Sequence, residues 1–270
     1  MPSLFLHIQE VKNIEVNKIF NEDCLEGMKR IPDKSIDMIL CDLPYGTTAC
    51  KWDTVIPLDL LWKHYMRIIK NNGAIVLTAS QPFTTKLINS NINVFKYNMI
   101  WEKPQAVDPF MSKIRPLNNI EDIIVFGEGR IGYHPQYSKG DPYVVTRDKK
   151  ERDYEITKTK MKETKTINDG KRLPKRVVKF NQQRGLHPTQ KPVALFEYLI
   201  KTYTNEGETV LDNCIGSGTT AVACINSNRS FIGIEQEQKY VDIANARIEK
   251  QGTFILPSQK RNIGEHGDES

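Results

Sequence analysis

Short apolar runs separated by amphipathic stretches recur along most of this chain. The runs that predict strands are 16–20, 35–41, 74–78, 94–101, 122–126, 209–213 and 230–234. Apolar residues at helical spacing predict helices over 24–30, 58–70, 82–89, 193–204, 218–227 and 236–250. The helix over 58–70 should stop at the turn formed by residues 71–73. The alternation of strands and helices predicts an α/β fold with a doubly wound, mostly parallel sheet.

The stretch 209–221 holds the most informative of these transitions. It has an apolar strand, a turn with Gly216 and Gly218, and a helix that begins near Thr219. Glycine accepts positive φ and lets a ligand approach the backbone near the free N–H groups of a helix N-terminus. The next strand ends at Glu235, where an acidic residue usually binds ribose hydroxyls. These features predict a site for an adenosine-containing cofactor; glycines that serve only the turn are the alternative.

Another strand stops at Asp42-Leu43-Pro44-Tyr45, because proline has no N–H to donate to a sheet. Asp42 and Tyr45 therefore lie at the carboxyl end of a strand, on the same sheet edge as the glycine turn. Ligands bind at that edge of open parallel sheets. An ordinary strand exit would not explain a carboxylate and an aromatic ring at this edge. Asp23, after the first strand, is either a helix N-cap or a cofactor ligand, and both remain open.

Charge is unevenly distributed along the chain. The whole chain carries +5, but residues 130–185 contain 16 lysines and arginines against 7 acidic residues, which gives +9 there and −4 elsewhere. Tyr133, Tyr137, Tyr143 and Tyr154 are interleaved with these basic residues. Such a mixture suits stacking on bases and contact with phosphates. We interpret the block as a partly flexible insertion with little amphipathic order; a solvated loop is the alternative.

Composition restricts the class of protein. The chain has 270 residues, 39% hydrophobic and 26% charged, as is usual for soluble globular proteins. It has no apolar run of about 18 residues and no signal-peptide pattern at its start, so we expect a cytoplasmic protein with no membrane contact. Five cysteines without a C-x-x-C pair favour a reducing compartment and argue against a zinc site.

Three motifs together resemble one known family. Residues 42–45 resemble the Asp-Pro-Pro-Tyr motif of DNA amino-methyltransferases, residues 212–220 resemble their S-adenosylmethionine motif, and residues 187–192 (His-Pro-Thr-Gln-Lys-Pro) resemble the segment before it. The order of catalytic motif, basic insert and cofactor motif matches the permuted beta group, over residues 16–250. The resemblance implies a Rossmann-like methyltransferase sheet, S-adenosyl-L-methionine as cofactor, double-stranded DNA as substrate, and no metal.

The resemblance also implies a division of the chain and a set of site residues. Residues 1–129 would form the catalytic half, 130–185 a target-recognition insertion, 186–252 the cofactor-binding half of the same domain, and 253–270 a loose tail. The implied catalytic residues are Asp42, Leu43, Pro44 and Tyr45. The implied cofactor-binding residues are Asp23, Cys24, His187, Thr189, Lys191, Asp212, Gly216, Ser217, Gly218, Thr219 and Glu235. The densest basic cluster, which we expect to contact phosphates, is Lys171, Arg172, Lys175 and Arg176.

The chemistry of the family gives the catalytic motif its roles. The Asp42 side chain and the Leu43 carbonyl would accept the N–H groups of an exocyclic amine, and Tyr45 would stack on a base that has left the duplex. Leu43 stands where the family usually has proline; it keeps the carbonyl but loses the fixed φ. The leading aspartate favours N6 of adenine as the target, and N4 of cytosine is the main alternative.

Other readings differ in substrate or class. RNA or a protein glutamine could supply the amine, or the chain could be a catalytically idle DNA-binding relative. A nicotinamide dehydrogenase is disfavoured, because the glycine motif comes late and residues 42–45 would be unexplained. The resemblance suggests a bacterial or phage origin. It leaves open the recognised DNA sequence, dimerisation, and the presence of a cognate restriction enzyme.

Overall fold

The computed structural model describes residues 14–46, 53–107, 109–147, 151–154, 157–160, 164–183 and 190–251. The chain forms two compact units. The smaller unit is Pro135–Lys175, and the larger one combines Met1–His134 with Arg176–Ser270. No helix in the described ranges has both the length and the apolar character needed to cross a membrane.

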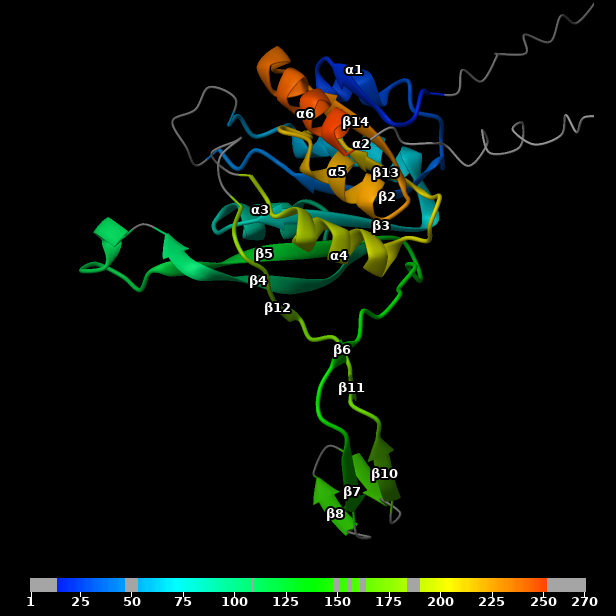
Figure 1. Ribbon diagram of the computed structural model, residues 1–270, viewed down its shortest axis with the longest axis vertical. Coiled ribbons are helices and arrows are strands. Elements are labelled where there is room, and N and C mark those ends of the chain that lie inside the picture. The colour runs from blue at the N-terminus through cyan, green and yellow to red at the C-terminus, as the bar shows by residue number, and fades with distance from the viewer. Residues whose placement is uncertain are drawn as a thin grey trace, which may run out of the picture. The chain divides into compact units, whose positions relative to one another are not determined.

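The described part of the larger unit is built on an eight-stranded sheet with the order β1-β14-β13-β2-β3-β5-β4-β12 (Figure 1). The strands are β1 (Lys18–Asn21), β2 (Ile36–Asp42), β3 (Ile69–Ala79), β4 (Phe95–Val107), β5 (Asn118–Phe126), β12 (Val177–Lys179), β13 (Thr209–Asp212) and β14 (Ser230–Glu235). Pairing is parallel from β1 to β3, β5 is antiparallel to β3 and β4, and β12 is parallel to β4. The predicted mostly parallel α/β sheet is therefore confirmed.

Helices cover both faces of this sheet. The helices α4 (Val193–Tyr203), α5 (Thr219–Asn226) and α6 (Gln238–Lys250) pack on one face, and α1 (Cys24–Met28), α2 (Leu58–Ile68) and α3 (Phe83–Ser90) pack on the other. Alternate residues of β2 serve the two layers: Met38 and Leu40 join the first cluster, whereas Ile39 and Cys41 join the second. Burial on both faces explains why the strand reads as a continuous apolar run.

The strand order brings the predicted motifs to one edge of the sheet. β13 and β2 are parallel neighbours with Leu211 opposite Ile39, so Asp212 and Asp42 end adjacent strands. β14, on the other side of β13, ends at Glu235. Asp42 thus meets Asp212 and Glu235, from the other half of the sequence, at the carboxyl ends of three neighbouring strands.

The predicted boundary between the helix over 58–70 and the strand that follows it is wrong. The helix was expected to end at a turn over residues 71–73, but α2 ends at Ile68 and β3 begins at Ile69. The register shifts between the pairs Ile36–Ile69 and Met38–Ala74. A bulge of this kind lets extra residues loop out without ending the strand. The polar residues that signalled a turn are therefore the exposed part of a bulged strand.

The smaller unit contains short antiparallel pairs: β7 with β10, β6 with β11, and β8 with β9. Its strands are β6 (Ser138–Lys139), β7 (Tyr143–Arg147), β8 (Glu151–Tyr154), β9 (Thr157–Lys160), β10 (Thr164–Asn168) and β11 (Lys171–Arg172). Val144 and Ile167 are 60% and 73% exposed. Because such pairs bury little apolar surface, they leave no alternating pattern in the sequence. β12, also within the basic block, pairs with β4 and so belongs to the main sheet.

Candidate active site

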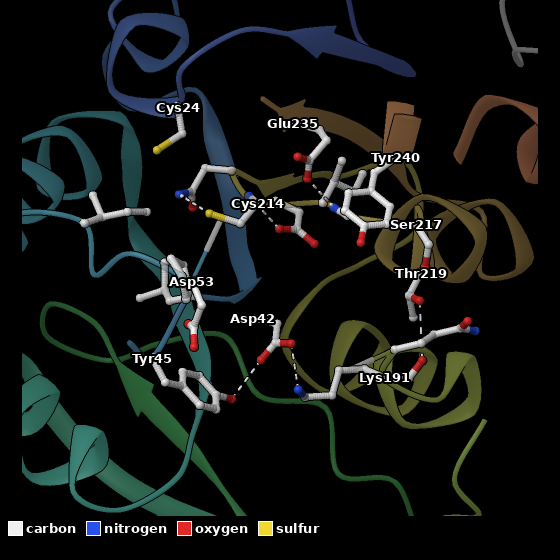
Figure 2. A pocket seen from close by; sticks show the side chains of 18 of the residues that line it. Cys24, Asp42, Tyr45, Asp53, Lys191, Cys214, Ser217, Thr219, Glu235 and Tyr240 are labelled. Carbon is white, nitrogen blue, oxygen red and sulfur yellow. Dashed lines mark hydrogen bonds and ion pairs between the residues drawn. The ribbon is translucent and has the colours of Figure 1, made fainter. Parts of the chain in front are cut away.

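A cavity of about 870 Å³ lies at the carboxyl edge of the sheet (Figure 2). The predicted site residues in its wall are Asp23, Cys24, Asp42, Leu43, Pro44, Tyr45, Lys191, Asp212, Gly216, Ser217, Thr219 and Glu235. Gly218 is not part of the wall. His187 and Thr189 lie outside the described residues. One cavity thus unites residues from both halves of the sequence.

The two glycines of the turn after β13 have different surroundings. Gly216 and Gly218 have φ of +51° and +82°, which confirms the predicted positive φ. A Cβ at Gly216 would meet only the Cys214 carbonyl oxygen, at 4.0 Å. A Cβ at Gly218 would lie 2.8 Å from Cβ of Ala244 in α6. Gly216 therefore leaves open space beside the cavity, whereas Gly218 permits close packing between the turn and α6.

The two acidic strand ends hold this turn in place. The Asp212 carboxylate accepts hydrogen bonds from the Cys214 N–H at 3.1 Å and from the Thr220 hydroxyl. The Glu235 carboxylate accepts from the N–H groups of Gly216 at 2.9 Å and Glu237 at 2.8 Å. Burial raises the pKa of both carboxyl groups, that of Asp212 to about 7. Both side chains therefore have a structural task besides facing the cavity.

Asp23 and Cys24 form another part of the wall. Oδ1 of Asp23 accepts from the N–H groups of Leu25 and Glu26 at 2.9 and 3.1 Å, which confirms the N-cap reading. A hydrogen bond with Cys214, together with burial, raises the pKa of the Cys24 thiol far above its ordinary value. Cys24 thus presents a neutral thiol to the cavity.

Both carboxylate oxygens of Asp42 have donors (Figure 2). Oδ1 accepts from the Tyr45 hydroxyl at 2.7 Å and from the Thr78 hydroxyl at 2.5 Å. Oδ2 accepts from Nζ of Lys191 at 2.6 Å. The carboxylate is held in a fixed orientation at the end of β2, and its side chain keeps 23% of its surface exposed. It is therefore both oriented and accessible.

A second carboxylate, Glu121 of β5, shares two of these donors, Tyr45 and Lys191. Its Oε1 lies 3.0 Å from the Tyr45 hydroxyl and 2.9 Å from Nζ of Lys191, and Oε2 lies 2.8 Å from Nζ of Lys103. Burial alone would raise the pKa of Glu121, but the two lysines hold it below its ordinary value. Burial opposes the charge of Lys191, yet Asp42 and Glu121 raise its pKa. Two carboxylates and two ammonium groups thus form one charged network.

The sequence did not predict Glu121, Lys103 or Thr78 as site residues. β5 runs antiparallel to β3, so the beginning of β5 lies at the edge where the parallel strands end. Strand direction is not visible in an apolar run. The only signal was an acidic pair, Glu121 and Asp122, at the start of an otherwise apolar strand.

The middle of the catalytic motif has clear packing roles. Leu43, which replaces the usual proline, is 4% exposed and belongs to the hydrophobic cluster that contains α2 and α3. The ring of Tyr45 stacks on Phe83 of α3, with centroids 5.3 Å apart and planes at 22°. The motif is therefore fixed by apolar packing as well as by the charged network.

The cavity has features suited to a polar organic ligand. Oε1 of Gln190, in the wall, is buried and has no hydrogen-bond partner among the described residues. Asp23, Glu235 and Gly216, which leaves open space, also line the cavity. The volume falls within the usual range of small-molecule sites, about 300–1,000 Å³. Within the described ranges, no group of three or more His, Cys, Asp or Glu side chains could hold a metal ion.

The predicted phosphate-contacting cluster is divided between the two units. Lys171, Arg172 and Lys175 belong to the smaller unit, and Arg176 belongs to the larger one. Nζ of Lys171 lies 3.7 Å from the ring centroid of Tyr137, and the Arg172 guanidinium lies 5.0 Å from that of Tyr143. The Arg176 guanidinium lies 5.5 Å from the ring centroid of Tyr97. Three of the four cations are therefore paired with aromatic faces.

Residues 36–246 match the family described as DNA methylase, so the chain belongs to that family. Among curated relatives, the Type II methyltransferase M2.MboI of Moraxella bovis is 27% identical over 270 residues, covering 91% of this chain and 92% of the relative. The Type II methyltransferase M.HinfI of Haemophilus influenzae is 28% identical over 268 residues, covering 89% of this chain and 70% of the relative.

Solved structures share the fold. The PvuII DNA methyltransferase, described as cytosine-N4-specific, has a TM-score of 0.63 at 16% identity, covering 87% of each chain. The complex of M1.HpyAVI with SAM has a TM-score of 0.59 at 24% identity, covering 85% of this chain and 98% of that one.

Proposed function

We propose that this protein transfers a methyl group from S-adenosyl-L-methionine to the exocyclic N6 amine of adenine in double-stranded DNA. The observation that carries the proposal is a single cavity lined both by Asp42 and Tyr45 and by Gly216 and Glu235. Membership of the DNA methylase family supports methyl transfer to DNA. Two relatives named as Type II methyltransferases support it further. Neither dimerisation nor a partner restriction enzyme is part of the proposal.

The cofactor would occupy the part of the cavity at the ends of β13 and β14. Gly216 leaves space for a close approach to the backbone, Glu235 would accept from the ribose hydroxyl groups, and Asp23 and Cys24 would approach the adenine. The unpartnered Oε1 of Gln190 is a further acceptor. S-adenosylmethionine, when bound, supplies an electrophilic sulfonium methyl group, and the electron pair of the broken C–S bond stays on sulfur.

Asp42 and Leu43 would prepare the amine. The lone pair of an aromatic exocyclic amine is delocalised into the ring, so the nitrogen is a poor nucleophile. Hydrogen bonds from its two N–H groups to the Asp42 carboxylate and the Leu43 carbonyl would make the nitrogen pyramidal and aim its lone pair. When the new N–C bond has formed, the nitrogen carries a positive charge, and one N–H proton passes to Asp42. Most of the acceleration would come from this alignment.

The target base must leave the duplex to reach Asp42, because its amine is otherwise paired and stacked. Tyr45 would hold that base, since its ring is fixed by Phe83 and its hydroxyl by Asp42. The leading aspartate of the motif supports adenine over cytosine.

The direct test incubates the protein with methyl-labelled S-adenosylmethionine and duplex DNA and then separates the nucleosides. We expect the label in N6-methyldeoxyadenosine. Label in N4-methyldeoxycytidine would correct the base but keep the reaction. The absence of labelled nucleosides, with intact cofactor binding by calorimetry, would favour a catalytically idle DNA-binding protein.

The role of Asp42 can be separated from its structural contacts. Asp42→Asn keeps the shape and one acceptor oxygen but removes the charge, so methylation should fall by on the order of 10²–10³. Cofactor affinity and thermal unfolding should remain close to wild type, because Lys191 keeps Glu121 as a partner. If the variant instead loses its fold, Asp42 is a structural residue.

A further inference from the structure

The Asp42 carboxylate, which we propose as an acceptor for the amine, already accepts three hydrogen bonds within the protein. Tyr45 and Thr78 donate to one oxygen of Asp42, and Lys191 donates to the other. Oδ1 has two donors, so an incoming N–H group must either replace one of them or share Oδ2 with the Lys191 ammonium, whose charged hydrogen bond weakens that oxygen as an acceptor. Loss of a donor would leave a polar group without a partner in a buried site, which is costly, and most costly for the ammonium of Lys191.

Glu121 already offers these donors a second acceptor. Its Oε1 lies within hydrogen-bond distance of both Tyr45 Oη, at 3.0 Å, and Lys191 Nζ, at 2.9 Å. No rearrangement of the backbone is needed for either donor to leave Asp42. Thr78 does not have this alternative among the contacts of Glu121.

We propose that Glu121 is a positioning residue that retains Lys191 and the Tyr45 hydroxyl when the amine binds, and so frees Asp42 to accept an N–H group. This inference rests on the proposed function, since it assumes that an amine reaches Asp42. Glu121 itself does not touch the reacting atoms; it acts through Lys191 and Tyr45.

The charges of the network support this role. Lys103 pairs with Oε2 of Glu121, on the side away from the shared donors, and helps to keep the carboxylate ionised. When Lys191 leaves Asp42, it stays paired with Glu121, so no buried charge is isolated. Without the charge of Glu121, Asp42 would be the only carboxylate left for Lys191. The ammonium would then compete directly with the amine.

The first test is Glu121→Gln, which preserves size and removes the charge. We expect the single-turnover methylation rate to fall by about tenfold or more, within the range of coupling among contacting groups. The dissociation constants for DNA and for cofactor should stay unchanged. Glu102→Gln is the matched control: Glu102 also pairs with a lysine, Lys179 at 3.1 Å, but lies outside the cavity wall. That control should keep the wild-type rate.

A double-mutant cycle distinguishes positioning from general support of the fold. If Glu121 acts by retaining its donors, Glu121→Gln should have a smaller effect once Lys191→Met has removed the competing ammonium, because only the Tyr45 hydroxyl is then left for Glu121 to retain. Independent, multiplicative losses in the cycle would overturn the proposal. An unchanged methylation rate for Glu121→Gln would also overturn the proposal for Glu121. The proposed function would remain, because it is tested by the methylation rate of the wild-type protein.

A second measurement needs no variant. In a crystal structure of the wild-type protein with duplex DNA and an unreactive cofactor analogue, Nζ of Lys191 should remain bonded to Glu121 and should have left Oδ2 of Asp42. If Nζ of Lys191 is still bonded to Asp42 and the amine binds elsewhere, the inference is overturned. If the wild-type protein methylates no DNA, the proposed function and the inference both fail.

Discussion

Asp212 places a carboxylate at the end of β13 with 3% of its surface exposed. Burial raises its pKa from 3.8 to about 7, although hydrogen bonds from Thr220 and Cys214 act in the opposite direction. A group whose pKa rises on folding stabilises the fold fully below its unfolded pKa, and this stabilisation is lost as the pH rises through the folded value. We therefore expect Asp212 to lower the free energy of unfolding progressively between pH 3.8 and about 7.

Asp212→Asn removes this titration and tests the sign. In urea unfolding at several pH values, the variant should gain stability relative to wild type as the pH rises from about 4 to about 8. The relative gain should be about 2–4 kcal/mol, because each pKa unit corresponds to about 1.4 kcal/mol. Asp242→Asn, at an exposed position on α6, should keep the pH dependence of wild type. If the difference in the free energy of unfolding between Asp212→Asn and wild type does not change with pH, the pKa of Asp212 is not raised.

The positions of individual residues relative to the strands explain which site residues could be predicted from the sequence. Asp42, Tyr45 and Glu235 each follow an apolar strand, and the carboxyl edge of a parallel sheet collects such residues. Glu121 could not be placed in this way, because it lies in the first half of a strand whose antiparallel direction depends on the pairing of β5 with β3. The ion pair between Lys191 and Glu121 could not be predicted either, because ion pairs between distant segments leave no local pattern in the sequence.

In the turn between β13 and α5, the two glycines serve different purposes: Gly216 leaves open space and Gly218 permits close packing on α6. Gly216→Ala adds a Cβ into open space at a φ of +51°, whereas Gly218→Ala places one 2.8 Å from Ala244 at a φ of +82°. Positive φ costs a residue with a side chain about 1–2 kcal/mol at either position. Overpacking adds about 1–3 kcal/mol at Gly218 alone.

Gly218→Ala should therefore lose more thermal stability than Gly216→Ala, and Gly216→Ala should lose more cofactor affinity. Differential scanning calorimetry and titration calorimetry on the two variants provide the comparison, and each variant is the control for the other. Equal losses of stability with no change in affinity would contradict the assignment of Gly216 to a ligand site.

Elements were predicted well where packing on both faces produced long apolar runs. The strands that end at Asp42, Asp212 and Glu235 were predicted to within a few residues for this reason. The boundary between α2 and β3 was not, because a bulge places polar residues inside a strand. The hairpins of the smaller unit were missed as well: their exposed faces carry residues such as Val144 and Ile167 without alternation.

At the scale of the whole molecule, charge and chemistry occupy different parts of the chain. Residues 130–185 carry +9 and the rest carries −4, and among the described residues the cavity wall takes only the uncharged Gln182 and Gln183 from this block. We propose that this basic block recognises DNA and that the sheet carries the reaction. Cations that neutralise phosphates release counterions, so affinity should fall with salt with a slope of about −0.9 per phosphate contact.

Replacing all four residues of the basic cluster, Lys171, Arg172, Lys175 and Arg176, by alanine should therefore make the salt slope shallower by roughly 2–4 units. Cofactor affinity should not change, because none of the four lies in the cavity wall. Fluorescence anisotropy with labelled duplex DNA at several salt concentrations measures the slope. A matched control replaces four exposed lysines outside the block: Lys29, Lys63, Lys86 and Lys250. If both quadruple variants change the salt slope equally, the effect comes from net charge alone. If the basic-cluster variant leaves the slope unaltered, these four residues belong to a solvated surface that does not contact DNA.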